Sequence, residues 1–257
     1  IIENAKLCHQ EFTVFYPIDY RYEDFVEKTL KELLKLKLDD LLKIRIRGLL
    51  AFVQTSNLPT PTDDDGEEKP LRALTKKEKI LVGKIEKDIK EVIGYYPDDK
   101  LFNAVYSNIL YLKKDFDNSF RHKLRGIEGI SSSQTFFSLW VKMSDVSEDF
   151  LSNYSDIVKD VIENYGVSVY DYIEHQFNED IGALYEKKRF TQIKKLYEYV
   201  KSDINNLPSI GEYSYTGGGL FELGYALSEC GEEKEAKTVY EAYLEGHSKS
   251  SSVLNNL

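Results

Sequence analysis

The chain has 257 residues, 42% hydrophobic and 30% charged, and its 19 Tyr and 13 Phe exclude a disordered protein, which lacks such aromatic content. The formal net charge of −10 disfavours nucleic acid as a partner, because phosphate backbones require positively charged grooves. No apolar run approaches the roughly 20 residues that span a bilayer, so no membrane association is expected.

The two cysteines, Cys8 and Cys230, lie far apart and form no CxxC pair. This spacing predicts neither a disulfide framework nor a zinc site, and it favours a reducing compartment. The start of the chain, residues 1–10, lacks the basic and then apolar order of a signal peptide. We therefore expect a cytoplasmic protein.

The first predicted helix covers residues 22–36, where apolar residues recur at helical spacing behind Asp24, a plausible N-cap. Residues 41–53 are apolar on most sides, and Lys43 to Arg47 alternate with a period of two. A buried helix and a strand both fit that pattern. Helix is favoured, and a small sheet at this point stays open.

A change of composition follows at residues 55–72, which are rich in Pro, Thr and Asp and predict an acidic loop or linker. Beyond it, one apolar stripe predicts a helix opened by Thr75 and ended near Gly94 and Pro97. Another helix begins near Asp99, and short polar breaks separate further helical segments. The expected fold class is all-α, with a more irregular N-terminal part.

Towards the C-terminus the spacing becomes regular over residues 220–240. The pattern consists of Leu220, Leu223, Gly224 and Leu227, a turn at Cys230-Gly231, and then Ala236 and Tyr240. It resembles the tetratricopeptide repeat, in which small Gly and Ala residues let two antiparallel helices approach closely. Two positions depart from the family: Leu220 replaces the usual Trp, and Ser248 stands where a closing Pro is expected.

The resemblance extends weakly to both sides of this repeat. Leu254 and Leu257 follow Leu220 and Leu223 by 34 residues, the family period, so the chain is expected to stop inside another repeat. More protein would then follow in the natural product. Upstream, a degenerate copy is predicted from helical patterns that contain Phe177, Ile181 and Leu184, then Phe190, Ile193, Tyr197 and Val200.

The resemblance implies an α-solenoid of stacked antiparallel helical hairpins, with a concave face that binds peptides or protein segments. The expected division is an N-terminal helical segment at 1–54, a linker at 55–72, a helical-hairpin region at 73–173 and tetratricopeptide-like repeats at 174–257. Within residues 1–170 no motif matches, and hairpins there are extrapolated from the pattern alone.

In such a solenoid the first helix of each hairpin lines the concave face. The partner-binding residues are therefore predicted to be Phe221, Tyr225, Ser228 and Asn256. Family members that clamp a carboxylate use Lys and Asn at such positions, so the aromatic residues here favour an apolar or aromatic-rich segment instead. The alternative is that both rings pack against the neighbouring hairpin.

Three other groups of residues have spacings that fit a binding or catalytic site. Glu174, His175, Glu179 and Asp180 have the spacing of a helix-borne metal or acid-base site, but a solvated helix face is favoured. A second group consists of basic residues followed by Trp140 and Lys142, and it fits a phosphate or acidic partner, yet a capped helix C-terminus is preferred; the basic residues are Arg121, His122, Lys123 and Arg125. Gly217 to Gly219 are interpreted as a turn before a repeat.

No GxSxG nucleophile elbow occurs, so no hydrolase chemistry is indicated. We expect no enzyme, and no catalytic residue, cofactor or metal ligand is assigned. The favoured function is a protein- or peptide-binding helical-repeat scaffold, the interaction or regulatory region of a larger protein. The alternative is a small-ligand-binding or catalytic helical domain in residues 1–170 with the repeats appended.

Overall fold

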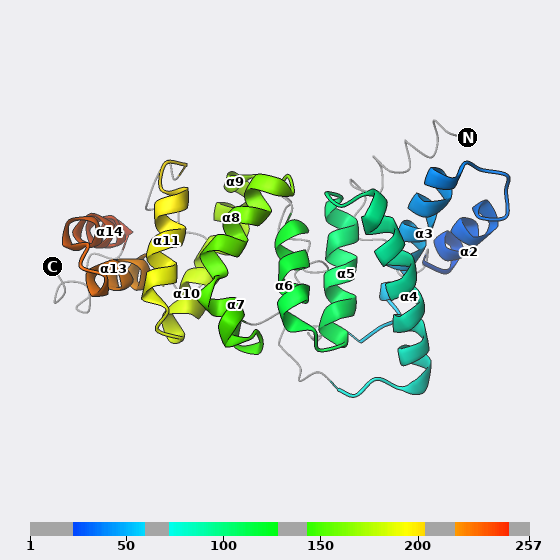
Figure 1. Cartoon of the computed structure of the whole chain (residues 1–257), viewed down its shortest axis with the longest axis horizontal. Helices are drawn as coiled ribbons and strands as arrows, with labels where there is room; N and C mark the ends of the chain where they lie inside the picture. Colours follow the sequence, from blue (N-terminus) through cyan, green and yellow to red (C-terminus); the bar gives the residue numbers. More distant parts are fainter. Residues whose placement is uncertain (1–22, 60–71, 128–142, 204–218, 247–257) are drawn as a thin grey trace. The chain divides into compact units, whose positions relative to one another are not determined.

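A computed structural model describes residues 23–59, 72–127, 143–203 and 219–246 of the chain (Figure 1). Over these residues all regular structure is helical and no strand is present, which confirms the all-α class. The described residues divide into two compact units, which meet in sequence between Asp115 and Phe116. This boundary lies inside the helical-hairpin region expected over 73–173.

Unit 1, up to Asp115, is built around α3, which packs against the three other helices. Its helices are α2 (Glu23–Leu33), α3 (Asp40–Thr55), α4 (Lys76–Tyr95) and α5 (Lys100–Leu112). The alternating segment 43–47 lies within α3, so the helical interpretation was correct. The N-cap expected at Asp24 was wrong, because α2 already begins at Glu23. Most of the predicted linker lies outside the described residues.

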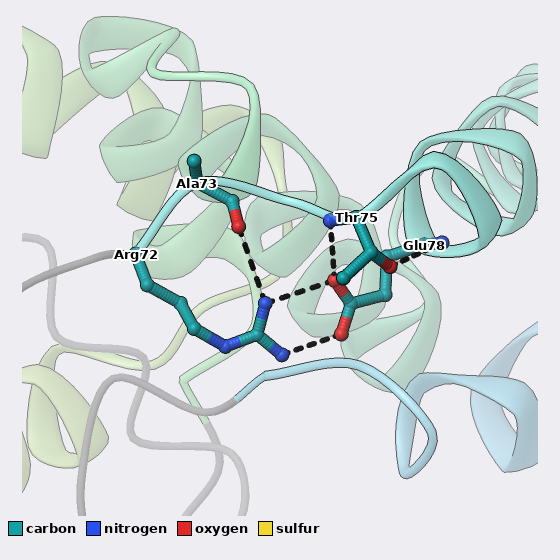
Figure 2. A network of polar contacts seen from close by, with 4 residues as sticks. All are labelled: Arg72, Ala73, Thr75 and Glu78. Atoms are coloured by element: carbon teal, nitrogen blue, oxygen red, sulfur yellow. Dashed lines mark hydrogen bonds and ion pairs between the residues drawn. The ribbon is translucent and has the colours of Figure 1, made fainter.

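The start of α4 is fixed by a capping box (Figure 2). The Thr75 hydroxyl accepts from the amide of Glu78 at 3.2 Å, and the Glu78 carboxylate accepts from the amide of Thr75 at 2.7 Å. Arg72 donates to both oxygens of the same carboxylate, at 2.9 and 2.5 Å. These hydrogen bonds lower the pKa of Glu78 to about 2, and the Arg72 guanidinium contributes most, followed by the Thr75 donors. The helix start predicted at Thr75 is confirmed.

The core of unit 1 is an apolar cluster contributed by all four helices. Ile85, Ile89 and Ile109 have no exposed surface, which fits the apolar stripes of α4 and α5. α3 approaches α5 closely at Gly48, where an added Cβ would stand 2.6 Å from the ring of Phe102. A larger residue at position 48 would therefore push α3 and α5 apart.

Unit 2, from Phe116 onward, contains shorter helices. They are α6 (Phe116–Arg125), η2 (Met143–Asp145), α7 (Glu148–Ser152), α8 (Tyr154–Asn164), α9 (Val169–Tyr172), η3 (Ile173–Phe177), α10 (Asn178–Glu186), α11 (Phe190–Val200), α13 (Gly219–Glu229) and α14 (Glu233–Gly246). η2 is a 3₁₀ turn and η3 is a π-helical turn that runs on directly into α10.

The last four helices of unit 2 pack in sequence order. α10 contacts α11 and α13, α11 contacts α13, and α13 contacts α14. The turn from α13 to α14 contains Gly231 at φ 79°, a conformation that favours glycine. The helix predicted over 190–200 is confirmed as α11, with Ile193 and Val200 fully buried. Among the described helices, none offers an apolar stretch of the length that a bilayer crossing requires.

Candidate functional site

α13 carries three of the four predicted partner-binding residues. Phe221, Tyr225 and Ser228 are each half-buried, and their spacing of four and three residues puts them on successive turns of one helix face. Asn256 lies outside the described residues. The structure therefore provides positions for Phe221, Tyr225 and Ser228 but does not test whether they bind a partner.

Tyr225 belongs to a group of three rings from three helices. Its ring meets Tyr185 of α10 at a centroid distance of 5.5 Å and Phe190 of α11 at 5.7 Å, both edge to face. Tyr185 and Phe190 are 6.0 Å apart. Edge-to-face rings attract one another beyond simple burial, so this aromatic cluster joins α10, α11 and α13. All three side chains are half-buried and keep part of their surface in solvent.

Phe221 has different neighbours. Its ring lies 6.3 Å from Tyr240 and 6.5 Å from Tyr243, both on α14. Phe221 thus packs within its own hairpin, whereas Tyr225 packs against the preceding one. For Tyr225 the alternative interpretation, contact with the neighbouring hairpin, describes the geometry. No local spacing in the sequence indicates that Tyr185 belongs to this group.

The surroundings of the aromatic cluster on α13 are acidic. The nearby carboxylate of Glu229 raises the pKa of Tyr225. Burial raises the pKa of Glu222, three residues before Tyr225. The Oε2 atom of Glu222 is buried and has no hydrogen-bond partner among the described residues. A carboxylate oxygen in this condition would gain from an incoming donor.

A second polar group, at Asp180, is enclosed within unit 2. Asp180 Oδ2 accepts from the hydroxyls of Tyr154 at 2.5 Å and Tyr172 at 2.7 Å, and Oδ1 accepts from Gln176 Nε2 at 2.9 Å. The side chain is only 1% exposed. Burial raises the pKa of Asp180 to about 6, although the three donors act in the opposite direction. The Asp180 network connects α8, α9, η3 and α10.

The solvated-face interpretation was therefore wrong for Asp180. The π-helical turn at 173–177 has a longer hydrogen-bond period than an α-helix, so it shifts the residues that follow relative to a regular helical pattern. Glu174 and His175 remain partly exposed, with His175 Nε2 3.6 Å from Glu174 Oε2. Because donors occupy both oxygens of Asp180 and solvent does not reach it, the network acts as a structural connection.

The basic residues 121–125 occupy the end of α6, as the capping interpretation predicted. The guanidinium of Arg125 lies 3.5 Å from the ring centroid of Tyr165, close enough for a cation–π contact. Trp140 and Lys142, which the sequence analysis added to this cluster, lie outside the described residues. The described part of the cluster therefore serves packing within unit 2.

In the described ranges, no three side chains of His, Cys, Asp or Glu gather in a way that would hold a metal ion. Cys230 is a free, half-buried thiol, and Cys8 lies outside those ranges. Comparison with protein-family models, curated proteins and solved structures gave no match. The resemblance of residues 220–240 to a tetratricopeptide repeat thus stays a prediction.

Proposed function

We propose that the chain is a protein-binding helical scaffold, and that the helical hairpins α10–α11 and α13–α14 hold a peptide segment of a partner. The observation that carries this proposal is the aromatic cluster of Tyr185, Phe190 and Tyr225, which is half-buried and shared by two successive hairpins. Partly exposed aromatic rings on rigid helices are typical anchors of protein interfaces.

The direction of the helices supports a repeat arrangement in this part of unit 2. An added Cβ at Gly219, the first residue of α13, would stand 2.6 Å from Oδ1 of Asn178, the first residue of α10. Further along the same two helices, the rings of Tyr185 and Tyr225 are in contact. α10 and α13 therefore run parallel, as the first helices of consecutive hairpins do in a solenoid.

The close packing within the last hairpin supports the same proposal. Tyr240 of α14 fills the space beside Gly224 of α13, and Ala236 of α14 is buried. A small residue facing a large ring allows two helices to approach closely, which is the packing that the tetratricopeptide resemblance implies. In this arrangement the chain is the interaction region of a larger protein and binds a partner without catalysing a reaction.

The chemistry of the surface defines the segment that would bind. The three rings offer apolar contact area. Glu222 and Glu229 supply negative charge on α13, the helix that carries Tyr225. An apolar or aromatic side chain next to Lys or Arg satisfies both features, because the cation meets the negative charge of the α13 carboxylates. We therefore propose a partner segment of mixed apolar and basic character.

The test is selection of displayed 12-residue peptides against the immobilised chain, followed by binding measurements with fluorescence anisotropy. We expect enrichment of peptides that combine an aromatic and a basic residue. Tyr225→Ala should weaken their binding about tenfold, as truncation of an interface aromatic residue does. Glu222→Gln should reduce the preference for the basic residue while the helices stay folded by circular dichroism.

The matched control is Tyr170→Ala, because Tyr170 lies on α9 outside the aromatic cluster and is 63% exposed. Selected peptides should bind this variant as tightly as the unchanged chain. Equal binding to the Tyr225→Ala and Tyr170→Ala variants would exclude the aromatic cluster as the binding surface. Failure to enrich any peptide would argue against a peptide-binding function for these hairpins.

A further inference from the structure

The outward face of α4 in unit 1 combines an exposed apolar side chain with four lysines. Ile80 is 66% exposed, which is among the highest exposed fractions of the large hydrophobic side chains in the described residues. Lys76 and Lys77 lie one turn before Ile80, Lys84 lies one turn after it, and Lys87 follows on the next turn. All four lysines are exposed. We refer to these five residues as the α4 lysine face.

The acidic residues of α4, which are Glu78, Glu86, Asp88 and Glu91, form no ion pair with these lysines, and Glu91 pairs with Arg47 of α3 instead. Glu78 is bound by Arg72 and by the amide of Thr75 (Figure 2). Glu86 accepts from Lys113, the C-cap residue of α5, at 2.7 Å. Within the described ranges, no carboxylate comes within ion-pair distance of the four lysines. Their charge is therefore available to an outside partner.

Neighbouring helices give this face only weak electrostatic compensation. The charge of Lys84 helps to lower the pKa of Glu27 in α2, but it is the smallest of the causes. The Glu27 carboxylate is hydrogen-bonded to Gln54 and Lys31 instead. Lys84 and Lys87 are three residues apart on one helix, and like charges at this spacing destabilise a helix. Local features that oppose stability are found preferentially at functional sites.

We propose that the α4 lysine face binds an acidic segment of a partner protein, which places an apolar side chain against Ile80. The lysines would pair with Asp and Glu side chains on either side of that contact. Space for the apolar contact is present beside Ile80, because an added Cβ at Gly83, three residues further on, would meet no atom within 4 Å. The proposal concerns unit 1 and does not rest on the peptide surface proposed for unit 2.

Two other anionic partners fit this face less well. Single-stranded nucleic acid is bound through aromatic rings on which bases stack, and the α4 lysine face contains no ring. An anionic bilayer binds a helix that has a broad apolar face with Trp, Phe or Leu, whereas here the only apolar side chain is Ile80. A protein segment with acidic residues around one apolar side chain matches both the positive charge and the small apolar area of the α4 lysine face.

The experiment uses the whole chain and a fluorescent 12-residue probe peptide, made of Glu and Asp with one central leucine. Fluorescence anisotropy at low and at physiological salt should show binding that weakens as salt rises. Lys84→Glu/Lys87→Glu should weaken binding about tenfold through like-charge repulsion. Ile80→Ala should weaken it about fivefold through lost apolar contact. A probe with alanine in place of leucine should be insensitive to the Ile80 substitution.

The control variant is Lys234→Glu/Lys237→Glu, which reverses two exposed lysines at the same spacing on α14 of unit 2. It should bind the probe like the unchanged chain, and circular dichroism should show all variants folded. Failure of the probe to bind, or equal loss in both double variants, would overturn the proposal. Stronger binding of oligo(dT) or of vesicles with phosphatidylserine at the same lysines would replace the acidic protein segment by that partner.

Discussion

The ring of Tyr240 lies against the backbone of Gly224. A Cβ atom added to Gly224 would stand 2.6 Å from Cε1 and 2.8 Å from Cδ1 of Tyr240, closer than real Cβ atoms come. Tyr240 is only 1% exposed, so its ring is enclosed by other parts of unit 2. The approach of α13 to α14 therefore depends on the missing side chain at position 224.

We predict that Gly224→Ala destabilises unit 2. Alanine favours a helix over glycine by up to about 1 kcal/mol. An extra methyl group in a tightly packed interface typically costs about 1–3 kcal/mol, so the steric term is the larger one. The free energy of unfolding should fall, and the amides of α13 and α14 should exchange faster with deuterium than in the unchanged chain.

Gly182→Ala is the matched control for this prediction. Gly182 also lies within a helix of unit 2, α10, but an added Cβ there would meet nothing within 4 Å. Only the helix-propensity term then remains, and stability should rise by up to about 1 kcal/mol. If both alanine variants were stabilised, the contact between Gly224 and Tyr240 would not limit the packing of the hairpin.

A second prediction concerns the start of α4. Thr75→Ala removes the hydroxyl that accepts from the amide of Glu78, and loss of such a cap typically costs about 1 kcal/mol. Unit 1 should be destabilised by that amount in urea unfolding, with faster hydrogen exchange in the first turn of α4. Thr29→Ala on α2 serves as the control, because Thr29 is exposed inside a helix and caps none. A loss of the same size in both variants would contradict the capping explanation.

Sequence reasoning succeeded where the structure depends on local chemistry. Thr75 and Asp99 begin helices because each side chain accepts a hydrogen bond from a backbone amide in the first turn, as their residue types predict. The apolar stripe around Ile85 and Ile89 predicted which side of α4 is buried. For residues 43–47, the buried helix prevailed over the alternating pattern because α3 packs against three neighbouring helices.

Sequence reasoning failed where distant residues determine the surroundings. Asp180 looked like part of a solvated face because the pattern assumes an uninterrupted α-helix, and the π turn before it changes that register. Its partner Tyr154 is 26 residues away, so no local spacing connects the two side chains. Tyr185 and Phe190 likewise join Tyr225 only through packing between hairpins.

The third prediction is that Asp180 makes the stability of unit 2 depend on pH. Burial raises the pKa of Asp180 from 3.8 to about 6 in the folded state. Between about pH 4 and pH 6 the folded chain therefore holds a proton that the unfolded chain has released. The contribution of Asp180 to stability is largest below about pH 4 and is lost as the pH rises through 6, by about 3 kcal/mol at most.

Asp180→Asn isolates this contribution. Other carboxylates, such as Glu27 and Glu86, have lowered pKa values and stabilise the fold as the pH rises, so the informative quantity is the difference between the unchanged chain and the variant. Urea unfolding followed by circular dichroism at pH 4, 5, 6 and 7 gives this difference. The stability of the unchanged chain relative to the Asp180→Asn variant should fall by about 2 kcal/mol from pH 4 to pH 7.

Tyr154→Phe tests the cause of that dependence. The substitution removes the hydroxyl that donates to Asp180 Oδ2 at 2.5 Å but keeps the buried ring. With one donor fewer the carboxylate is less well stabilised, so the pKa of Asp180 should rise further and the loss of stability should extend above pH 6. For Asp180→Asn, a difference that stays constant from pH 4 to pH 7 would mean that Asp180 does not take up a proton in the folded chain over that range. For Tyr154→Phe, a constant difference would mean that the lost hydroxyl does not change the pKa of Asp180.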